Sequence, residues 1–129
     1  MTDATDVVRA HYGRMASGDV PGALATLSPD VEWVEAAGFP YAGTYHGPEA
    51  VVENVFARIG AEWDGFKVVP DVIVGDGDVV AALGWYSGTY KATGKAFEAR
   101  YVHWFTVTGG RISRFEQVTD TSVIAAALS

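Results

Sequence analysis

Residues 95–120 read KAFEARYVHWFTVTGGRISRFEQVTD, and this stretch decides the fold. Aromatic and β-branched residues fill two arms around Gly109-Gly110, which predicts two strands joined by a tight turn. Alternation along the first arm places these side chains on one face: Phe97, Ala99, Tyr101, His103 and Phe105. The other face carries Glu98, Arg100, Val102, Trp104 and Thr106. A lone histidine among aromatic side chains is the first sign of a functional site.

The composition is typical of one globular domain. The chain has 129 residues, 49% of them hydrophobic, so we expect a single core and a single domain over residues 1–129. The chain contains no cysteine, which excludes disulfides and thiolate chemistry. The formal net charge of −7 disfavours nucleic acid as a partner, because phosphates require a basic surface.

The location of the protein is also an expectation from composition. No apolar run approaches the roughly 20 residues that span a bilayer. The start, MTDATDVVRA, is acidic and lacks the basic and apolar regions of a signal peptide. We therefore expect a cytoplasmic protein with no membrane partner.

Outside the hairpin, the patterns predict helices first, then strands, and a short helix at the end. Apolar spacing and capping signals predict helices over 5–16, from Asp19, from Pro48 to Gly60 and over 122–128. Alternation predicts strands over 31–35, 66–74 and 79–90, and a loop over 36–46. Helices followed by a run of antiparallel strands are typical of an α+β domain.

Glycines and apolar faces predict how the elements assemble. Gly84 and Gly88 interrupt a long strand, which favours a sharply curved sheet. We expect a cone-shaped antiparallel sheet with three helices from the N-terminal half on its concave face and a ligand cavity between the layers. On the outer face, Val102, Trp104 and Val118 are too apolar for free exposure, so we predict a homodimer packed through that face.

Four segments resemble the nuclear transport factor 2-like superfamily, in particular its SnoaL-like and ketosteroid isomerase-like branches. These segments are SGDVPGALATLSPDVEW (17–33), GTYHGPEAV (43–51), GDGDVVA (75–81) and GGRISRF (109–115). They follow the family's order across nearly the whole chain. The resemblance implies a cystatin-like α+β barrel, a fold that hosts isomerases, cyclases, epoxide hydrolases, dehydratases and binding modules.

The resemblance also implies site residues. Ketosteroid isomerases place a carboxylate base after the first strand, at the position of Glu35. Their two oxyanion donors fall on His11, which has Tyr12 beside it, and on His103. SnoaL-type cyclases use an aspartate where this chain has Gln117, which we expect to orient substrate. The remaining candidates for the pocket wall are aromatic: Trp33, Phe56, Trp85, Tyr101 and Phe115.

These residue types suit proton transfer next to a carbonyl group. A base must reach the carbon acid while a donor meets the oxygen on which charge develops. Glu35 gains basicity in an apolar pocket, and a neutral imidazole can donate an N–H to an enolate oxygen. The sequence therefore predicts a cofactor-independent isomerase or cyclase that acts on a small hydrophobic carbonyl compound, such as a polyketide or terpenoid intermediate.

The candidates also have a structural interpretation, in which Glu35 is a solvated loop acid and His103 is a core histidine. The alternative function is then a non-catalytic small-molecule-binding or dimerisation module of the same fold. A raised pKa for Glu35 and a position in the cavity would favour the enzyme. The histidines match no recognised spacing of metal ligands, so no metal is expected.

Overall fold

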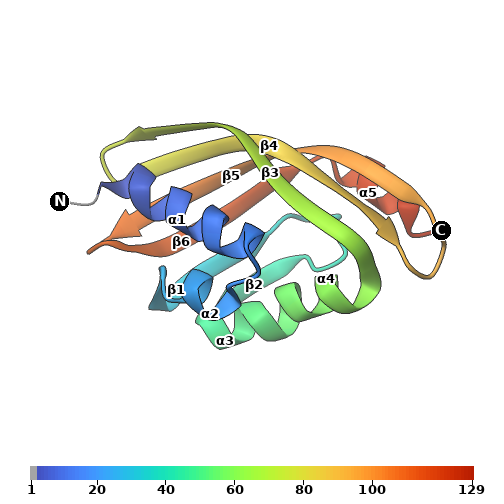
Figure 1. Ribbon diagram of the computed structural model, residues 1–129, viewed down its shortest axis with the longest axis horizontal. Helices are drawn as coiled ribbons and strands as arrows, with labels where there is room; N and C mark the ends of the chain where they lie inside the picture. The colour runs from blue at the N-terminus through green and yellow to red at the C-terminus, as the bar shows by residue number, and fades with distance from the viewer. Residues whose placement is uncertain (1–2) are drawn as a thin grey trace.

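The computed structural model describes residues 3–129 as a curved, open sheet with helices on its concave side (Figure 1). The strands are β1 (Leu27–Glu35), β2 (Gly43–His46), β3 (Trp63–Asp76), β4 (Val79–Tyr90), β5 (Ala96–Thr108) and β6 (Arg111–Thr119). The helices are α1 (Ala4–Ala16), α2 (Val20–Leu24), α3 (Pro48–Val51), the π-helix η1 (Val52–Phe56), α4 (Ala57–Glu62) and α5 (Thr121–Ala127). The strand order is β2-β1-β6-β5-β4-β3, and the predicted α+β class is confirmed.

Two features of the sheet differ from the expectation. The sheet is mixed rather than wholly antiparallel, because β1 runs parallel to β6 and places Trp33 opposite Phe115. The predicted loop over 36–46 contains β2, which pairs antiparallel with β1. This strand gave no alternation signal because it is a short edge strand in which only Tyr45 is partly buried.

The first helix positions two candidate residues. Its N-terminus is a capping box in which Asp3 accepts from the Asp6 N–H at 2.9 Å and Asp6 accepts from the Asp3 N–H. The helix packs against β3, β4, β5 and β6, and its buried side includes His11 and Tyr12. Helix α1 therefore brings these two side chains onto the concave face of the sheet.

The predicted helix from Pro48 to Gly60 is longer and less regular than expected. It continues to Glu62, and its middle turn, Val52–Phe56, is a π-helix. Such π-turns widen a helix locally and often occur at functional sites. Phe56, the last residue of this turn, lies at the cavity described below.

Gly84 marks the point where three strands approach closely. It pairs with Pro70 next to a register shift between β3 and β4, and it lies opposite Tyr101 on β5. A Cβ atom at Gly84 would lie 2.4 Å from the Val69 carbonyl oxygen and 2.5 Å from the Tyr101 hydroxyl. The sequence predicted that Gly84 allows the sheet to curve sharply. The structure gives the reason: the neighbouring strand and Tyr101 come so close that no side chain fits at this position.

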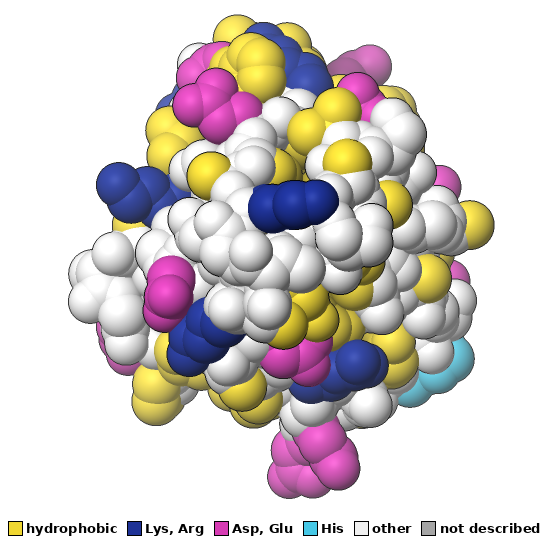
Figure 2. Space-filling model, turned by 90° about the vertical axis from the view of Figure 1, so that its right-hand side faces the viewer, with side chains coloured by type: hydrophobic (Ala, Val, Ile, Leu, Met, Phe, Trp, Pro, Cys, Tyr) yellow, Lys and Arg dark blue, Asp and Glu magenta, His cyan; other side chains and the backbone are white. Residues whose placement is uncertain are grey.

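Figure 2 shows the end near α5 and the C-terminus, where basic and acidic side chains are interspersed with apolar ones. Within residues 3–129, no helix has the length and apolar character that crossing a bilayer requires.

Candidate functional site

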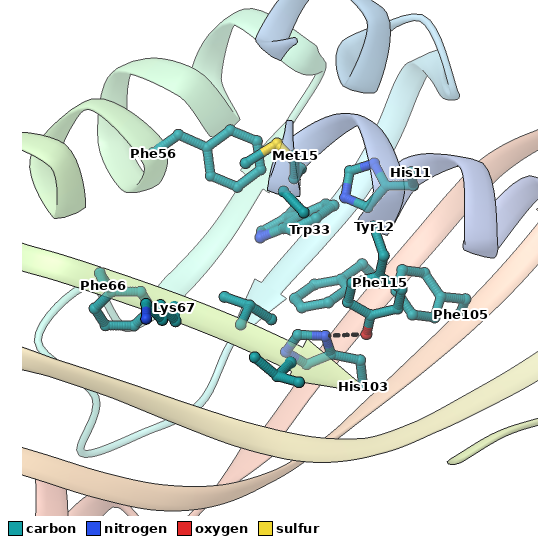
Figure 3. A pocket seen from close by; sticks show the side chains of 13 residues that line it. His11, Tyr12, Met15, Trp33, Phe56, Phe66, Lys67, His103, Phe105 and Phe115 are labelled. Carbon is teal, nitrogen blue, oxygen red and sulfur yellow. Dashed lines mark hydrogen bonds between the residues drawn. The ribbon is translucent and has the colours of Figure 1, made fainter. Parts of the chain in front are cut away.

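A cavity of about 360 Å³ lies between the helices and the concave face of the sheet (Figure 3). Its wall is largely aromatic and aliphatic. The predicted site residues that line it are His11, Tyr12, Trp33, Phe56, His103 and Phe115. The further lining residues are Met15, Ala16, Phe66, Lys67, Val68, Val69 and Phe105. Trp33 stacks on Phe115 with ring centroids 3.7 Å apart, which closes the β1–β6 side of the cavity.

His103 is a neutral histidine held between two tyrosines. Its Nδ1 lies 2.6 Å from the Tyr12 hydroxyl, and its Nε2 forms a short hydrogen bond with the Tyr86 hydroxyl. Burial holds the pKa of His103 well below its usual range. A neutral imidazole donates through one nitrogen and accepts through the other, so its two tyrosine partners have opposite roles.

Gln117 fixes the direction of this hydrogen-bond chain. Its side-chain oxygen accepts the Ala36 N–H at 3.0 Å, so its amide nitrogen donates to the Tyr86 hydroxyl, also at 3.0 Å. Among residues 3–129, the Tyr86 hydroxyl has His103 as its one acceptor. Tyr86 therefore donates to His103 Nε2, and His103 Nδ1–H donates to Tyr12. The Tyr12 hydroxyl then keeps a proton to donate, for which a ligand in the cavity competes with the nearby Tyr101 hydroxyl.

His11 presents a hydrogen-bond acceptor to the same cavity. Its Nδ1 lies 3.0 Å from the Thr26 hydroxyl and 3.3 Å from the Ala23 carbonyl oxygen. The Thr26 hydroxyl donates its proton to that carbonyl at 2.6 Å, so Nδ1 of His11 carries the hydrogen. The other nitrogen, Nε2, is then unprotonated, and Figure 3 shows it on the side of Trp33 and Met15. This acceptor differs from the donor that the resemblance implied.

Burial keeps His11 uncharged. It lowers the pKa of His11 to about 4, and the nearby Arg14 adds a smaller effect in the same direction. The two rings of His11 and Tyr12 have centroids 6.1 Å apart. The inner wall of the cavity therefore combines one acceptor and one donor, both neutral and both from α1.

Glu35 is buried but does not line the cavity. Only 5% of the residue is exposed, so it is not the solvated loop acid of the structural interpretation. Its Oε1 accepts from the indole N–H of Trp33 at 2.9 Å, and its Oε2 has no partner within residues 3–129. Burial raises the pKa of Glu35 to about 8, and the bond from Trp33 offsets part of this effect. The carboxyl group of Glu35 thus has the raised pKa that is expected of a base, but it does not lie at the cavity, where a base would meet the substrate.

Tyr101 and Gln117 support the site from outside the cavity. Tyr101 is buried and stacks on His103 at 4.0 Å, while Gln117 holds Tyr86 as described. The sequence reasoning missed Tyr86, although its alternation with Val80 and Ala82 places it on the concave face.

The prediction that Trp85 lies at the pocket is wrong. This residue is 43% exposed, and the Arg100 guanidinium lies 4.7 Å from its ring centroid on the outer face. Along β4 the side chains alternate, and Tyr86 points inward, so Trp85 points outward. Among the described residues, no three His, Cys, Asp or Glu side chains gather as a metal site would require.

Comparison with known proteins places this geometry among related structures. Residues 8–115 match the model of the SnoaL-like domain. An NTF2-like protein from Burkholderia thailandensis is 43% identical, with a TM-score of 0.98 over 100% of this chain and 99% of that chain. The uncharacterized protein Rv0034 of Mycobacterium tuberculosis is 34% identical over 125 residues, which cover 91% of this chain and 90% of the relative. TerC, co-crystallized with polyporic acid, is 25% identical, with a TM-score of 0.88 over 98% of both chains.

Proposed function

The chain belongs to the SnoaL-like domain family within the NTF2-like superfamily, and from this we propose a cofactor-independent acid–base enzyme of the isomerase or cyclase type. Its substrate would be a small hydrophobic carbonyl compound, such as a polyketide or terpenoid intermediate. The observation that carries the proposal is the hydrogen-bond chain that ends at the Tyr12 hydroxyl in an apolar cavity. The crystals of TerC with polyporic acid support a small organic ligand for this fold.

In the proposed reaction, Tyr12 donates to the substrate carbonyl oxygen. His103 donates to the Tyr12 oxygen and so supports that hydroxyl as negative charge develops on the substrate. His11 Nε2 accepts the proton from the adjacent carbon, which leaves an enolate held by Tyr12 and an imidazolium at His11. Because burial disfavours the charged imidazole, His11 readily returns the proton to another carbon, as an isomerisation requires.

Glu35 has a positioning role in this proposal. Its carboxyl group binds the indole N–H of Trp33, and Trp33 forms a wall of the cavity. The resemblance implied a base at Glu35, whereas the proposal assigns proton transfer to His11 because its free nitrogen lies at the cavity.

The test is proton exchange at an activated carbon. The wild-type protein should accelerate loss of the α-proton signals of 2-tetralone in D₂O, followed by NMR. Tyr12→Phe should slow this exchange by about 10- to 100-fold, since one donor to the developing oxyanion is lost. Tyr45→Phe is the matched control, because the Tyr45 hydroxyl binds the Tyr41 carbonyl oxygen and does not line the cavity. Equal rates for wild type and Tyr12→Phe would contradict the role of Tyr12.

A non-catalytic binding module is the second candidate function. It is favoured by the position of Glu35, since none of the described residues that line the cavity carries a carboxylate. In that case wild-type protein would bind 2-tetralone, measured by titration calorimetry, without accelerating its exchange.

We also propose a homodimer formed through the outer face of the sheet. Apolar side chains exposed by 43% to 57% gather there: Val72, Val74, Trp85, Trp104 and Val118. Two charged pairs within the chain lie beside them, Arg100 with Asp71 at 2.7 Å and Arg114 with Glu116 at 2.9 Å. A face with paired charges can meet an identical face without like-charge repulsion, so a second copy suits it.

Trp104→Glu should convert the dimer to a monomer. A charge at the centre of an apolar interface stays unpaired and buried, which weakens association at least about 100-fold. Sedimentation velocity measures this change. Ala92→Glu, at an exposed turn, is the matched control and should remain a dimer. A monomeric wild type would refute the proposal.

A further inference from the structure

The polar side chains at the inner wall of the cavity are buried and uncharged. His11 presents the unprotonated Nε2 of a neutral imidazole, and Tyr12 presents a hydroxyl group. His103 is a neutral imidazole between the hydroxyls of Tyr12 and Tyr86. Behind it stacks Tyr101, and burial raises the pKa of its hydroxyl to about 12. This wall therefore offers hydrogen bonds to a ligand but no opposite charge.

Lys67 has a formal charge, but its side chain belongs to the outer face of the sheet. It pairs with Ser87, the neighbour of Tyr86 on β4, and Tyr86 points inward. Because successive residues of a strand point to opposite faces, Ser87 and Lys67 point outward. There Lys67 lines a surface pocket together with Asp64 and Glu98. It contributes to the cavity wall from β3 without directing its ammonium group inward.

Two further ionisable residues lie close to the site but outside the cavity. Arg14, which follows His11 by three residues on α1, is exposed and donates to the Gly22 carbonyl oxygen at 2.9 Å. Glu35 is buried beside Trp33, and burial raises its pKa to about 8, so its carboxyl group is mostly protonated at neutral pH. Among the described residues, none therefore balances the charge of an anionic ligand in the cavity.

The absence of a balancing charge at this wall separates neutral ligands from anionic ones. An anion would lose its hydration in the cavity and would face the lone pair of His11 Nε2. A neutral ligand loses less hydration, can accept from Tyr12 and can donate to His11. The proposed proton transfer to His11 escapes this penalty, because it moves charge within the site and leaves the net charge unchanged.

We propose that the site takes its substrate in uncharged form: a flat ketone, or a phenol or enol that retains its hydroxyl proton, but not the conjugate base. The inference rests on the proposed function, because it uses the same cavity and the same roles of Tyr12 and His11. The substrate class excludes carboxylates. It includes weakly acidic hydroxy-carbonyl compounds, which the protein binds together with one proton above their own pKa.

A ligand that reports its own ionisation tests the inference. 7-Hydroxycoumarin is flat, has a carbonyl at one end and a hydroxyl at the other, and ionises slightly above neutral pH. Its absorption spectrum distinguishes the phenol from the phenolate. Binding to wild type should raise the pKa of this ligand by about one unit or more, which corresponds to at least about 10-fold weaker binding of the phenolate. Titration of the bound ligand between pH 6.5 and 9 measures the shift.

Two controls separate the charge of the ligand from other effects of pH. 7-Methoxycoumarin cannot ionise, so its affinity should change little between pH 6.5 and 8. Glu35→Gln should still raise the pKa of bound 7-hydroxycoumarin, because the cavity itself is neutral. A shift that disappears in Glu35→Gln would assign the selection to the charge of that acid and overturn the inference.

A cation placed in the wall should remove the preference. Met15 lines the cavity beside Phe56 and is only half-buried, so Met15→Lys can present an ammonium group there (Figure 3). This variant should bind the phenolate about 3- to 10-fold more tightly than wild type does, as expected for a partly exposed ion pair. Met15→Leu is the matched control and should keep the preference of wild type. Equal behaviour of these two variants would contradict selection by charge.

The outcomes for wild type distinguish the inference from the proposed function. A bound ligand with the phenolate spectrum, or equal affinity for the two forms, would overturn the inference and leave the proposed reaction intact. Failure to bind either coumarin would also overturn it, while tetralone exchange would still decide the proposed function. Binding of the neutral form without tetralone exchange would count against the proposed reaction alone.

Discussion

Replacing Gly84 with alanine should lower the free energy of unfolding by about 2–3 kcal/mol. The added Cβ would lie 2.4 Å from the carbonyl oxygen of Val69, which belongs to the neighbouring backbone and cannot rotate away. It would also lie 2.5 Å from the hydroxyl of Tyr101. That ring is stacked between Tyr86 at 4.5 Å and His103 at 4.0 Å, so moving it disturbs both neighbours. Urea unfolding followed by tryptophan fluorescence measures the change.

Gly13→Ala is the control for this substitution. Gly13 lies inside α1, and nothing lies within 4 Å of a Cβ built there. Alanine at this position should stabilise the protein by about 0.5–1 kcal/mol, since glycine is a poor helix former. Equal effects of the two substitutions would show that the close approach at Gly84 is relaxed without cost.

The second large effect is expected at Glu35 and depends on pH. Its pKa is raised from 4.5 to about 8 in the folded protein, so between these values the folded state holds a proton that the unfolded state has lost. Stability should therefore fall as pH rises from about 4.5 to 8 and be level above that range. Glu35→Gln removes this loss. At pH 9 it should stabilise the protein on the order of 3–5 kcal/mol, and at pH 4.5 it should have little effect.

His11 and His103 act in the opposite direction on the acid side. Their pKa values are lowered in the folded protein, so the unfolded state binds protons first as the pH falls below 6.5. Stability should therefore decrease with acidification in this range. Together with Glu35, these groups predict maximal stability close to pH 6.5.

Thermal unfolding at half-unit steps from pH 5 to 9 measures how stability falls on each side of this maximum, that is, the acid limb and the alkaline limb of the curve of stability against pH. Glu35→Gln should flatten the alkaline limb and leave the acid limb unchanged. Glu53→Gln is the matched control, because Glu53 is an exposed acid on η1 and should leave both limbs as in wild type. An alkaline limb that persists in Glu35→Gln would exclude Glu35 as its cause.

Much of the fold could be predicted because one face of β1, β4 and β5 is buried. Alternation in β5 correctly placed Tyr101, His103 and Phe105 on one face, and the observed burial follows it. The same rule applied to β4 would have selected Tyr86 over Trp85. It was not decisive there because both residues are aromatic and two glycines interrupt the pattern.

The site was harder to predict because its key contacts join distant parts of the chain. Tyr12 and His103 are 91 positions apart, and no spacing rule relates a residue of α1 to one of β5. The side-chain face of Glu35 was predictable, since it alternates with Trp33, but its depth was not. Trp33 and Glu35 lie on the same buried face of β1, but only Trp33 lines the cavity. Glu35, the last residue of the strand, is buried outside it.

The parallel pairing of β1 with β6 has a consequence for folding during synthesis. Residues of β1 leave the ribosome early, but Trp33 meets its stacking partner Phe115 only when the last strand has emerged. Closing so long a loop costs entropy before the contact repays it, which slows folding. The nascent chain therefore exposes an unpaired β1 edge for most of its synthesis, and that edge is the segment in which aggregation or chaperone binding should begin.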